Sequence, residues 1–255
     1  MMSRRLINAP PRSEQRRQER LLLEMDRRFA RLIAAEVARA TRVMLARFEA
    51  TGSAPSLPDD HERRIADIYR QIALMSIETF GARVVGQGKS RGLILETKDF
   101  AAFFARLAGE YIEKEVIRAR ITSVTESTRT QIVRQIASGQ SEGLGTRAIA
   151  KLISSSVSGI SRRRGRLIAR TETHGAANYG ANGAAMATGL TLRKEWVASE
   201  DERTRDTHRD ADGQTVDMDQ GFDVGGESLF YPGDPDGSAE NTINCRCGVS
   251  HIVVD

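Results

Sequence analysis

The side chains best suited to chemistry gather near the end of this sequence. The stretch from Trp196 to Cys247 holds the only tryptophan and both cysteines, with His208 inside it and His251 just after it. Thiolate and imidazole donors suit a borderline-soft ion, so His208, Cys245, Cys247 and His251 are the ligand types of a tetrahedral zinc centre. Zinc is therefore the candidate cofactor.

The spacing of the cysteines leaves a second interpretation open. One residue separates Cys245 from Cys247, whereas zinc knuckles typically have roughly two to four residues between their cysteines. In the alternative without metal, one cysteine is a core residue, the other is a weakly hydrogen-bonding thiol, and His251 points outward from the last strand. A disulfide between them is not expected, because bridging positions i and i+2 is strained and closes almost no loop.

Charged residues crowd around His208 and suggest either a scaffold or a catalytic site. As a scaffold, they would form an ion-pair lattice in which arginine forks are clamped by carboxylates. The expected members are Asp201, Arg203, Arg205, Asp206 and His208, with Arg170 and Glu172 pairing within or beside the lattice. As a catalytic site, His208 would be a general base, or a metal ligand with Asp210 or Asp212 nearby, as in nucleases.

The charges of the chain are segregated. It has 255 residues and a net charge of +4, but residues 199–255 carry 4 Arg against 14 Asp and Glu, a net −10, so residues 1–198 carry +14. The basic part could face nucleic acid or an acidic protein surface through counterion release and Coulomb steering. The alternative is that its arginine-rich helices present solvated faces. No apolar run is long enough for a membrane span or a secretory signal, so we expect a cytosolic protein with free thiols.

A long amphipathic helix is predicted from Ser13 to about Ala50, because apolar residues recur there at mixed spacings of three and four. The mean spacing between successive apolar residues of this helix is about 3.7 residues, which suits packing into a groove of a partner protein as well as a coiled coil. We therefore interpret it as a partner-binding helix with an apolar stripe of Leu22, Met25, Phe29, Ile33, Val37, Met44 and Phe48.

Further helices are predicted up to residue 187. Asp59 with Glu62 forms a capping box for a second helix, which we expect to be broken by glycines at 81, 86 and 88. A third helix begins near Asp99, a fourth covers 123–137, and a loop occupies 138–145. A short helix from Thr146 to about Ser154, a linker at 154–159 and a helix over 162–187 complete the helical part. The last of these is rich in Gly and Ala, so it must be packed closely against another element.

The pattern changes to period two after Gly189, which predicts a strand up to Val197. Asp212-Gly213 is a hairpin signal, and a closing strand is expected near 249–254. The predicted fold is α+β, with long N-terminal helices followed by a helix and a small turn-rich β module. We expect three regions: residues 1–57 as a docking helix, 58–145 as a helical region and 146–255 as an α+β domain.

Short motifs in one order make residues 146–248 resemble a known family. They are Ile168-Ala169-Arg170-Thr171-Glu172, a small-residue helix, Lys194-Glu195-Trp196, residues 201–208, Asp212-Gly213, Tyr231-Pro232 and Asn244-Cys245-Arg246-Cys247. This order is similar to the head-morphogenesis domain of the phage Mu F and SPP1 minor head proteins. The family-like residues are Arg170, Glu172, Trp196, Asp201, Arg203, Arg205, His208, Cys245 and Cys247. One departure is that Thr242-Ile243-Asn244 precedes Cys245 without the Pro-His that often stands upstream in the family.

The resemblance implies a minor capsid protein of a tailed phage or related element. Such a protein is expected in several copies at the portal vertex inside the head, after assembly in the host cytoplasm, where it assists head assembly, DNA packaging or delivery. Its implied partners are the portal protein or the capsid interior, with packaged double-stranded DNA as a further candidate and no membrane. The family has no one established reaction, so we expect no enzyme. The alternatives are a metal-dependent phosphodiesterase acting on DNA and a DNA-binding module.

Overall fold

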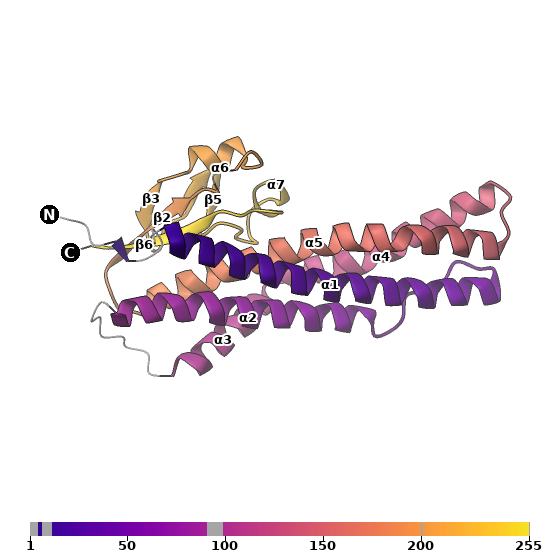
Figure 1. The fold of residues 1–255 in the computed structure, drawn as a ribbon, viewed down its shortest axis with the longest axis horizontal. Helices are drawn as coiled ribbons and strands as arrows, with labels where there is room; N and C mark the ends of the chain where they lie inside the picture. The colour runs from indigo at the N-terminus through magenta and orange to yellow at the C-terminus, as the bar shows by residue number, and fades with distance from the viewer. Residues whose placement is uncertain (1–4, 7–11, 91–98, 200, 255) are drawn as a thin grey trace.

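The computed structural model describes residues 5–6, 12–90, 99–199 and 201–254. Long helices run along an elongated molecule, and a small β module lies beside them at one end (Figure 1). The predicted α+β class is confirmed. The helices of the body are α1 Arg12–Thr51, α2 His61–Ser90, α3 Phe100–Glu113, α4 Glu115–Ser141 and α5 Thr146–Met186.

Helix α1 forms as predicted, and α3 begins directly after Asp99, whose side chain accepts a hydrogen bond from the backbone N–H of Ala102. Two predicted interruptions are wrong. Helix α2 continues through its glycines to Ser90, and α5 is continuous across the predicted linker at 154–159. Tertiary packing outweighs weak helix propensity in both cases: Gly81 faces the ring of Phe104, and α5 contributes buried residues on both sides of the linker, such as Ile153 and Ala169.

The apolar stripe of α1 lies in the intramolecular core. Its first half packs with α2 and the middle of α5, and its second half packs with α4 and the start of α5. Of the seven predicted docking residues, six are buried and Leu22 is partly buried: Leu22, Met25, Phe29, Ile33, Val37, Met44 and Phe48. The prediction of a partner-binding face on these residues is therefore wrong for the folded chain, because other helices of the same chain already cover them.

The three predicted regions share their cores. The boundaries after residues 57 and 145 do fall in loops between helices. However, one buried cluster joins α1, α2 and α5, and another joins α2, α3, α4, α5 and the β module. The N-terminal helix is thus an integral part of the body.

The β module follows α5. Its elements are β2 Leu192–Val197, α6 Asp206–Asp210, β3 Thr215–Asp217, β4 Phe222–Val224, β5 Glu227–Leu229, α7 Ala239–Thr242 and β6 Gly248–Val253. An antiparallel sheet has the order β1-β6-β2-β3, where β1 is Arg5–Leu6, and β4 pairs with β5. The two predicted strands correspond to β2 and β6.

Glycine turns set the path of the module. Gly225 and Gly226 both have positive φ, 63° and 85°, which suits the two-residue turn between β4 and β5. The predicted turn at Asp212-Gly213 returns the chain to β2, since the N–H of Gly213 donates to the carbonyl of Trp196 at 2.9 Å. The chain then runs back along β2 as β3.

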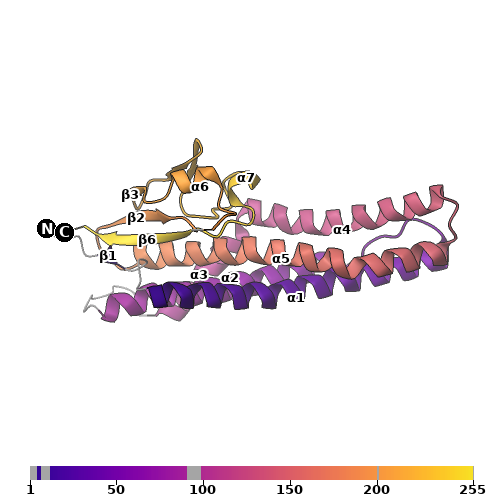
Figure 2. The ribbon, with the colours of Figure 1, turned by 45° about the horizontal axis from the view of Figure 1, so that its top comes forward.

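The sheet lies along the C-terminal part of α5 (Figure 2). Asn178 of α5 fastens the two together: its side-chain amide donates to the carbonyls of Pro232 and Cys247 at 2.9 and 3.0 Å, and its oxygen accepts from the N–H of Val249. Among the residues with described placement, no helix is both long and apolar enough to span a membrane.

Candidate functional site

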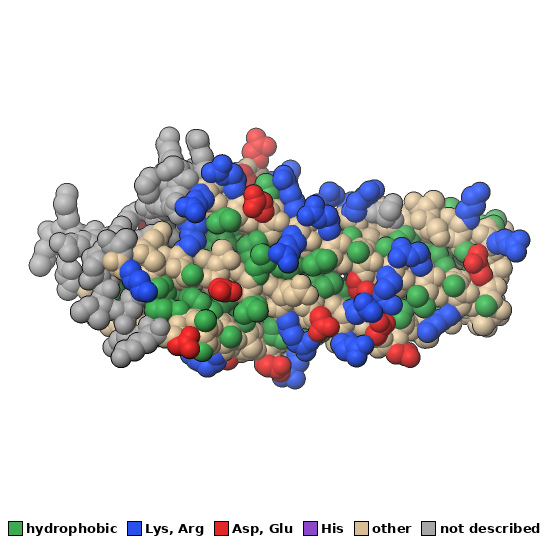
Figure 3. All heavy atoms as spheres, turned by 60° about the horizontal axis from the view of Figure 1, so that its bottom comes forward, with side chains coloured by type: hydrophobic (Ala, Val, Ile, Leu, Met, Phe, Trp, Pro, Cys, Tyr) green, Lys and Arg blue, Asp and Glu red, His purple; other side chains and the backbone are tan. Residues whose placement is uncertain are grey.

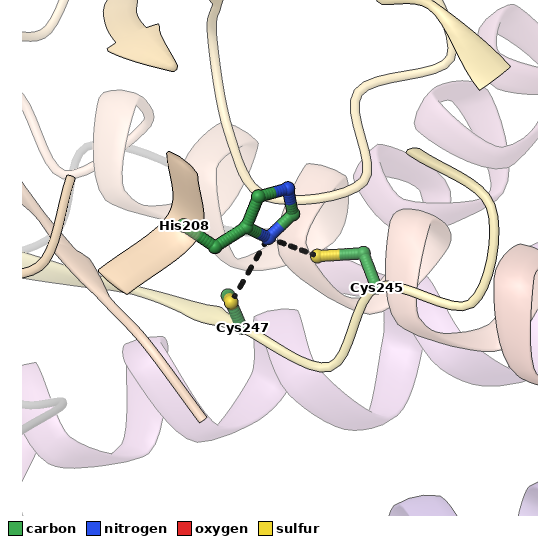
Figure 4. A group of neighbouring side chains, drawn as sticks. All are labelled: His208, Cys245 and Cys247. Carbon is green, nitrogen blue, oxygen red and sulfur yellow. Dashed lines mark hydrogen bonds between the residues drawn. The ribbon is translucent and has the colours of Figure 1, made fainter. Parts of the chain in front are cut away.

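Three of the four predicted zinc ligands converge in the β module (Figure 4). The Nδ1 atom of His208 lies 3.4 Å from Sγ of Cys247 and 3.7 Å from Sγ of Cys245. All three donor atoms lie within 4.8 Å of one another. The side chains are buried, with 1%, 2% and 3% of their residues' surface exposed for His208, Cys245 and Cys247.

His208 is held in place by its helix and by an aromatic wall. It belongs to the short α6, and its ring meets the edge of Trp196 at right angles, with 5.4 Å between ring centroids. Trp196 in turn packs against Phe222 of β4. Arg205, at the start of α6, donates to the carbonyl of Ile243 at 2.6 Å and so ties α6 to the segment that carries the cysteines.

The two cysteines are positioned by a sharp backbone turn at Asn244. This residue has a φ of 60°, in the left-handed region that asparagine tolerates better than most residues. Its N–H donates to the hydroxyl of Thr171, and its side-chain oxygen accepts from Arg170 at 3.2 Å. Two motifs that are separate in the sequence, 170–172 and 244–247, are therefore adjacent in the fold.

The two thiols interact strongly. A hydrogen bond from Cys245 lowers the pKa of Cys247 to about 5, against the effect of burial, with further help from His208. The same hydrogen bond and burial raise the pKa of Cys245 well above its usual value. The pKa values of the two thiols are therefore shifted in opposite directions by their mutual contact.

His251 does not join this group. It lies on β6, where it pairs with Lys194 of β2 and Leu6 of β1, and its Nε2 faces the side-chain oxygen of Asn182 at 3.4 Å. Burial, helped by the charge of Lys194, lowers the pKa of His251 to about 3. Its predicted role as the fourth ligand is therefore not supported by its position, and its predicted outward orientation is wrong as well.

The predicted ion-pair lattice around His208 does not form. Asp201 pairs with Arg246, whose Nη1 lies 2.6 Å from Oδ2, and Asp206 pairs with Arg209 within α6. Arg205 binds a backbone carbonyl, and the side chain of Arg203 is exposed with no ion pair to any residue of the described ranges. The acidic and basic residues of this stretch thus fasten separate loops.

Arg170 and Glu172 instead bind the helical body. Arg170 pairs with Asp26 of α1 at 3.3 Å, and Glu172 pairs with Arg120 of α4 at 3.4 Å. Burial raises the pKa of Asp26 to about 6 despite this arginine, and burial also raises the pKa of Glu172. The prediction that they pair inside or beside the module's own lattice is wrong.

Sequence reasoning did not single out Asp26, Arg120 or Asn178. Asp26 is a charged residue next to Met25 in the apolar stripe. A charged residue on the face of a helix that points toward the core is a signal that sequence reasoning could have used. Asn178 stands among small residues of α5, where an amide has little reason to occur without a partner. Arg120 carries no comparable signal, because arginines are frequent throughout the body.

The geometry suits metal binding better than acid–base catalysis. Two sulfurs and one imidazole nitrogen face a common point, which is the arrangement a soft or borderline metal requires. The carboxylates of the rival catalytic interpretation are elsewhere: Asp210 is exposed, and Asp212 accepts the backbone N–H of Ala198. Neither belongs to the cluster.

Comparison with known proteins agrees with the family resemblance. The family described as "Phage Mu protein F like protein" matches residues 130–250. The chain is 29% identical over 149 residues to "Minor head protein GP7" of Bacillus phage SPP1, a match that covers 56% of this chain and 48% of that protein. It is also 30% identical over 152 residues to "NAD(+)--arginine ADP-ribosyltransferase EFV" of Enterococcus faecalis (strain ATCC 700802 / V583), with 58% of this chain and 30% of that protein covered.

The chain thus matches less than half the length of either of these relatives. No solved structure matches it.

Proposed function

Because residues 130–250 match the family of phage Mu F-like proteins, we propose that the protein is a minor head protein of a tailed phage or a related element. The observation that carries the proposal is the match to the SPP1 minor head protein, which covers more than half of this chain. The matched family region contains the cysteine segment, α6 and all of α5, so it includes the whole candidate site.

We place the protein inside the head, at the portal vertex, where it assists head assembly, DNA packaging or delivery. The segregation of basic and acidic residues along the chain supports a position between two surfaces of unlike charge. The helical body carries the basic excess of the chain and the β module its acidic excess, so the two ends would orient the molecule in the field of a charged partner.

The exposed arginines of α5 are the surface that we propose for contact with DNA or an acidic partner. Arg162, Arg163 and Arg166 are exposed and have no ion pair with residues in the described ranges. Lys and Arg side chains also line much of the face shown in Figure 3, with acidic side chains between them. The exposed arginines of α5 replace the apolar stripe of α1 as the candidate docking surface, because that stripe is buried.

The test is the composition of purified particles. The full chain should be found by mass spectrometry in procapsids and mature heads, in several copies per particle, and should co-purify with the portal protein from a lysate that lacks assembled heads. Its absence from both procapsids and heads would refute the proposal. Presence in heads without portal association would refute the portal position alone.

We propose no catalytic activity for this chain. The carboxylates needed for metal-assisted phosphodiester hydrolysis are not among the ligands, and the donor atoms are buried. The activity in the name of the Enterococcus faecalis relative is that protein's own, and the match covers 30% of its length. Purified chain incubated with plasmid DNA and divalent metals should nick no faster than a His208→Ala variant, and faster nicking by the unaltered chain would contradict us.

A further inference from the structure

The geometry points to a bound zinc ion held by His208, Cys245 and Cys247, which ties α6 to the C-terminal segment of the β module. This inference goes beyond the proposed place in the head and does not depend on it. It commits to three protein ligands, Nδ1 of His208 and Sγ of each cysteine, with a solvent molecule in the fourth position.

The distances are those that a tetrahedral zinc ion imposes. Zn–S bonds of about 2.3 Å and Zn–N bonds of about 2.0–2.1 Å at tetrahedral angles place nitrogen and sulfur about 3.6 Å apart. The two nitrogen–sulfur distances observed are 3.4 and 3.7 Å. The sulfur atoms, which such an ion would hold about 3.8 Å apart, lie within the 4.8 Å that encloses all three donors.

The charge of the complex suits its buried position. Zn²⁺ with two thiolates and a neutral imidazole has no net charge, so the complex suits a buried position that an isolated ion would not. Binding displaces to solvent the thiol protons that remain on the cysteines, and no redox step is involved.

The close Cys-X-Cys spacing is accommodated by the backbone turn. Asn244 has a positive φ and is held by Thr171 and Arg170, so both Cys245 and Cys247, which directly precedes β6, reach Nδ1 of His208. The ion would replace weak S–H contacts with bonds that join residues 37 and 39 positions apart in the sequence. The ion would therefore join α6 to the segment that carries the cysteines.

The experiment measures metal in the full chain, purified under reducing conditions without a histidine tag. We expect about one zinc per chain by mass spectrometry after dialysis against metal-free buffer. Replacement of zinc by Co²⁺ should produce a sulfur-to-cobalt charge-transfer band and the visible bands of tetrahedral cobalt. Removal of the metal by a strong chelator should lower Tm by ~5–10 °C, the shift expected for a ligand present at about 100 times its Kd.

Substitutions assign the ligands. His208→Ala, Cys245→Ser and Cys247→Ser should each reduce zinc content by roughly tenfold or more. His251→Ala is the matched control: it removes the other histidine of the module, also buried, and should leave zinc content unchanged. Because the first measurement uses the unaltered chain, failure of a variant to fold does not weaken the test.

Three results would overturn the inference. The first is unaltered chain that binds neither Zn²⁺ nor Co²⁺ in titration under reducing conditions. The second is full zinc retention by Cys247→Ser. The third is copper or iron as the stoichiometric metal. Any of these would leave the proposed place in the phage head untouched, because that proposal is tested by particle composition.

Discussion

Replacing Gly180 with alanine should destabilise the protein, although alanine is the better helix former. Gly180 lies in α5 against the backbone of α2, and a Cβ atom there would stand 2.6 Å from Cα and 2.8 Å from the carbonyl oxygen of Ile77. Carbon atoms in contact are about 3.5–4.0 Å apart, so the helices would have to separate by about 1 Å. The clash is with backbone, so no side-chain rotation relieves it.

The size of the effect follows from two opposing contributions. Alanine in a helix interior is worth about 1 kcal/mol relative to glycine, whereas overpacking typically costs about 1–3 kcal/mol. Because the clash is with main-chain atoms of Ile77, which cannot rotate away, we take the upper end and expect Gly180→Ala to lower the free energy of unfolding by about 1–2 kcal/mol. This corresponds to a decrease in Tm of roughly 2–8 °C.

The matched control is Gly86→Ala in α2. Gly86 is also inside a helix, but it is exposed and a Cβ atom there meets nothing within 4 Å. This variant should be more stable than the unaltered chain by about 0.5–1 kcal/mol. Urea unfolding followed by circular dichroism measures both variants. If Gly180→Ala were as stable as Gly86→Ala, the close approach of α2 and α5 would be refuted.

Three further predictions concern protonation, DNA and helix capping. Burial lowers the pKa of His251 from 6.5 to about 3, so between these pH values the unfolded chain binds a proton that the folded chain does not. The free energy of unfolding should therefore decrease by up to about 1.4 kcal/mol per pH unit as pH falls from 6.5 toward 3. His251→Asn should flatten this slope in urea titrations, and an unchanged slope would contradict the burial of His251. Retention on DNA should fall steeply with salt, and alanine at Arg162, Arg163 and Arg166 should reduce the slope of log K against log salt by about 0.9 for each phosphate that is no longer neutralised; salt-independent binding would exclude that surface. Asp99→Ala should cost about 1 kcal/mol in urea unfolding, because it removes the N-cap of α3, and a change near zero would show that this cap does not contribute.

Local patterns predict the elements that depend on local interactions. The spacing of apolar residues identifies α1, Asp99 marks the start of α3, and alternation after Gly189 identifies β2. The glycines of α2 and the serines at 154–156 favour breaks because they weaken an isolated helix. They lie within continuous helices because neighbouring helices stabilise those segments, a contribution that local propensity does not include.

The candidate site is only partly visible in the same way. The residue types His208, Cys245 and Cys247 point to a metal, and the structure brings these three together. His251 has the same chemistry but lies on the strand beyond the turn, where its register places it against Lys194 and Asn182. Residue type alone does not determine which of two histidines reaches a pair of cysteines.

The sequence by itself determined the inventory: a basic helical part, an acidic module, the apolar stripe of α1 and the donors of a soft metal site. Only the tertiary structure decided the partners. It placed the stripe of α1 in the protein's own core, paired Arg170 with Asp26 and Glu172 with Arg120, and removed His251 from the metal donors. The reason is physical. The periodicity of apolar residues and the charge of a side chain indicate only that a residue needs a partner. Which of several partners distant in the sequence it meets depends on how the long helices pack and on where the turn at Asn244 directs the chain.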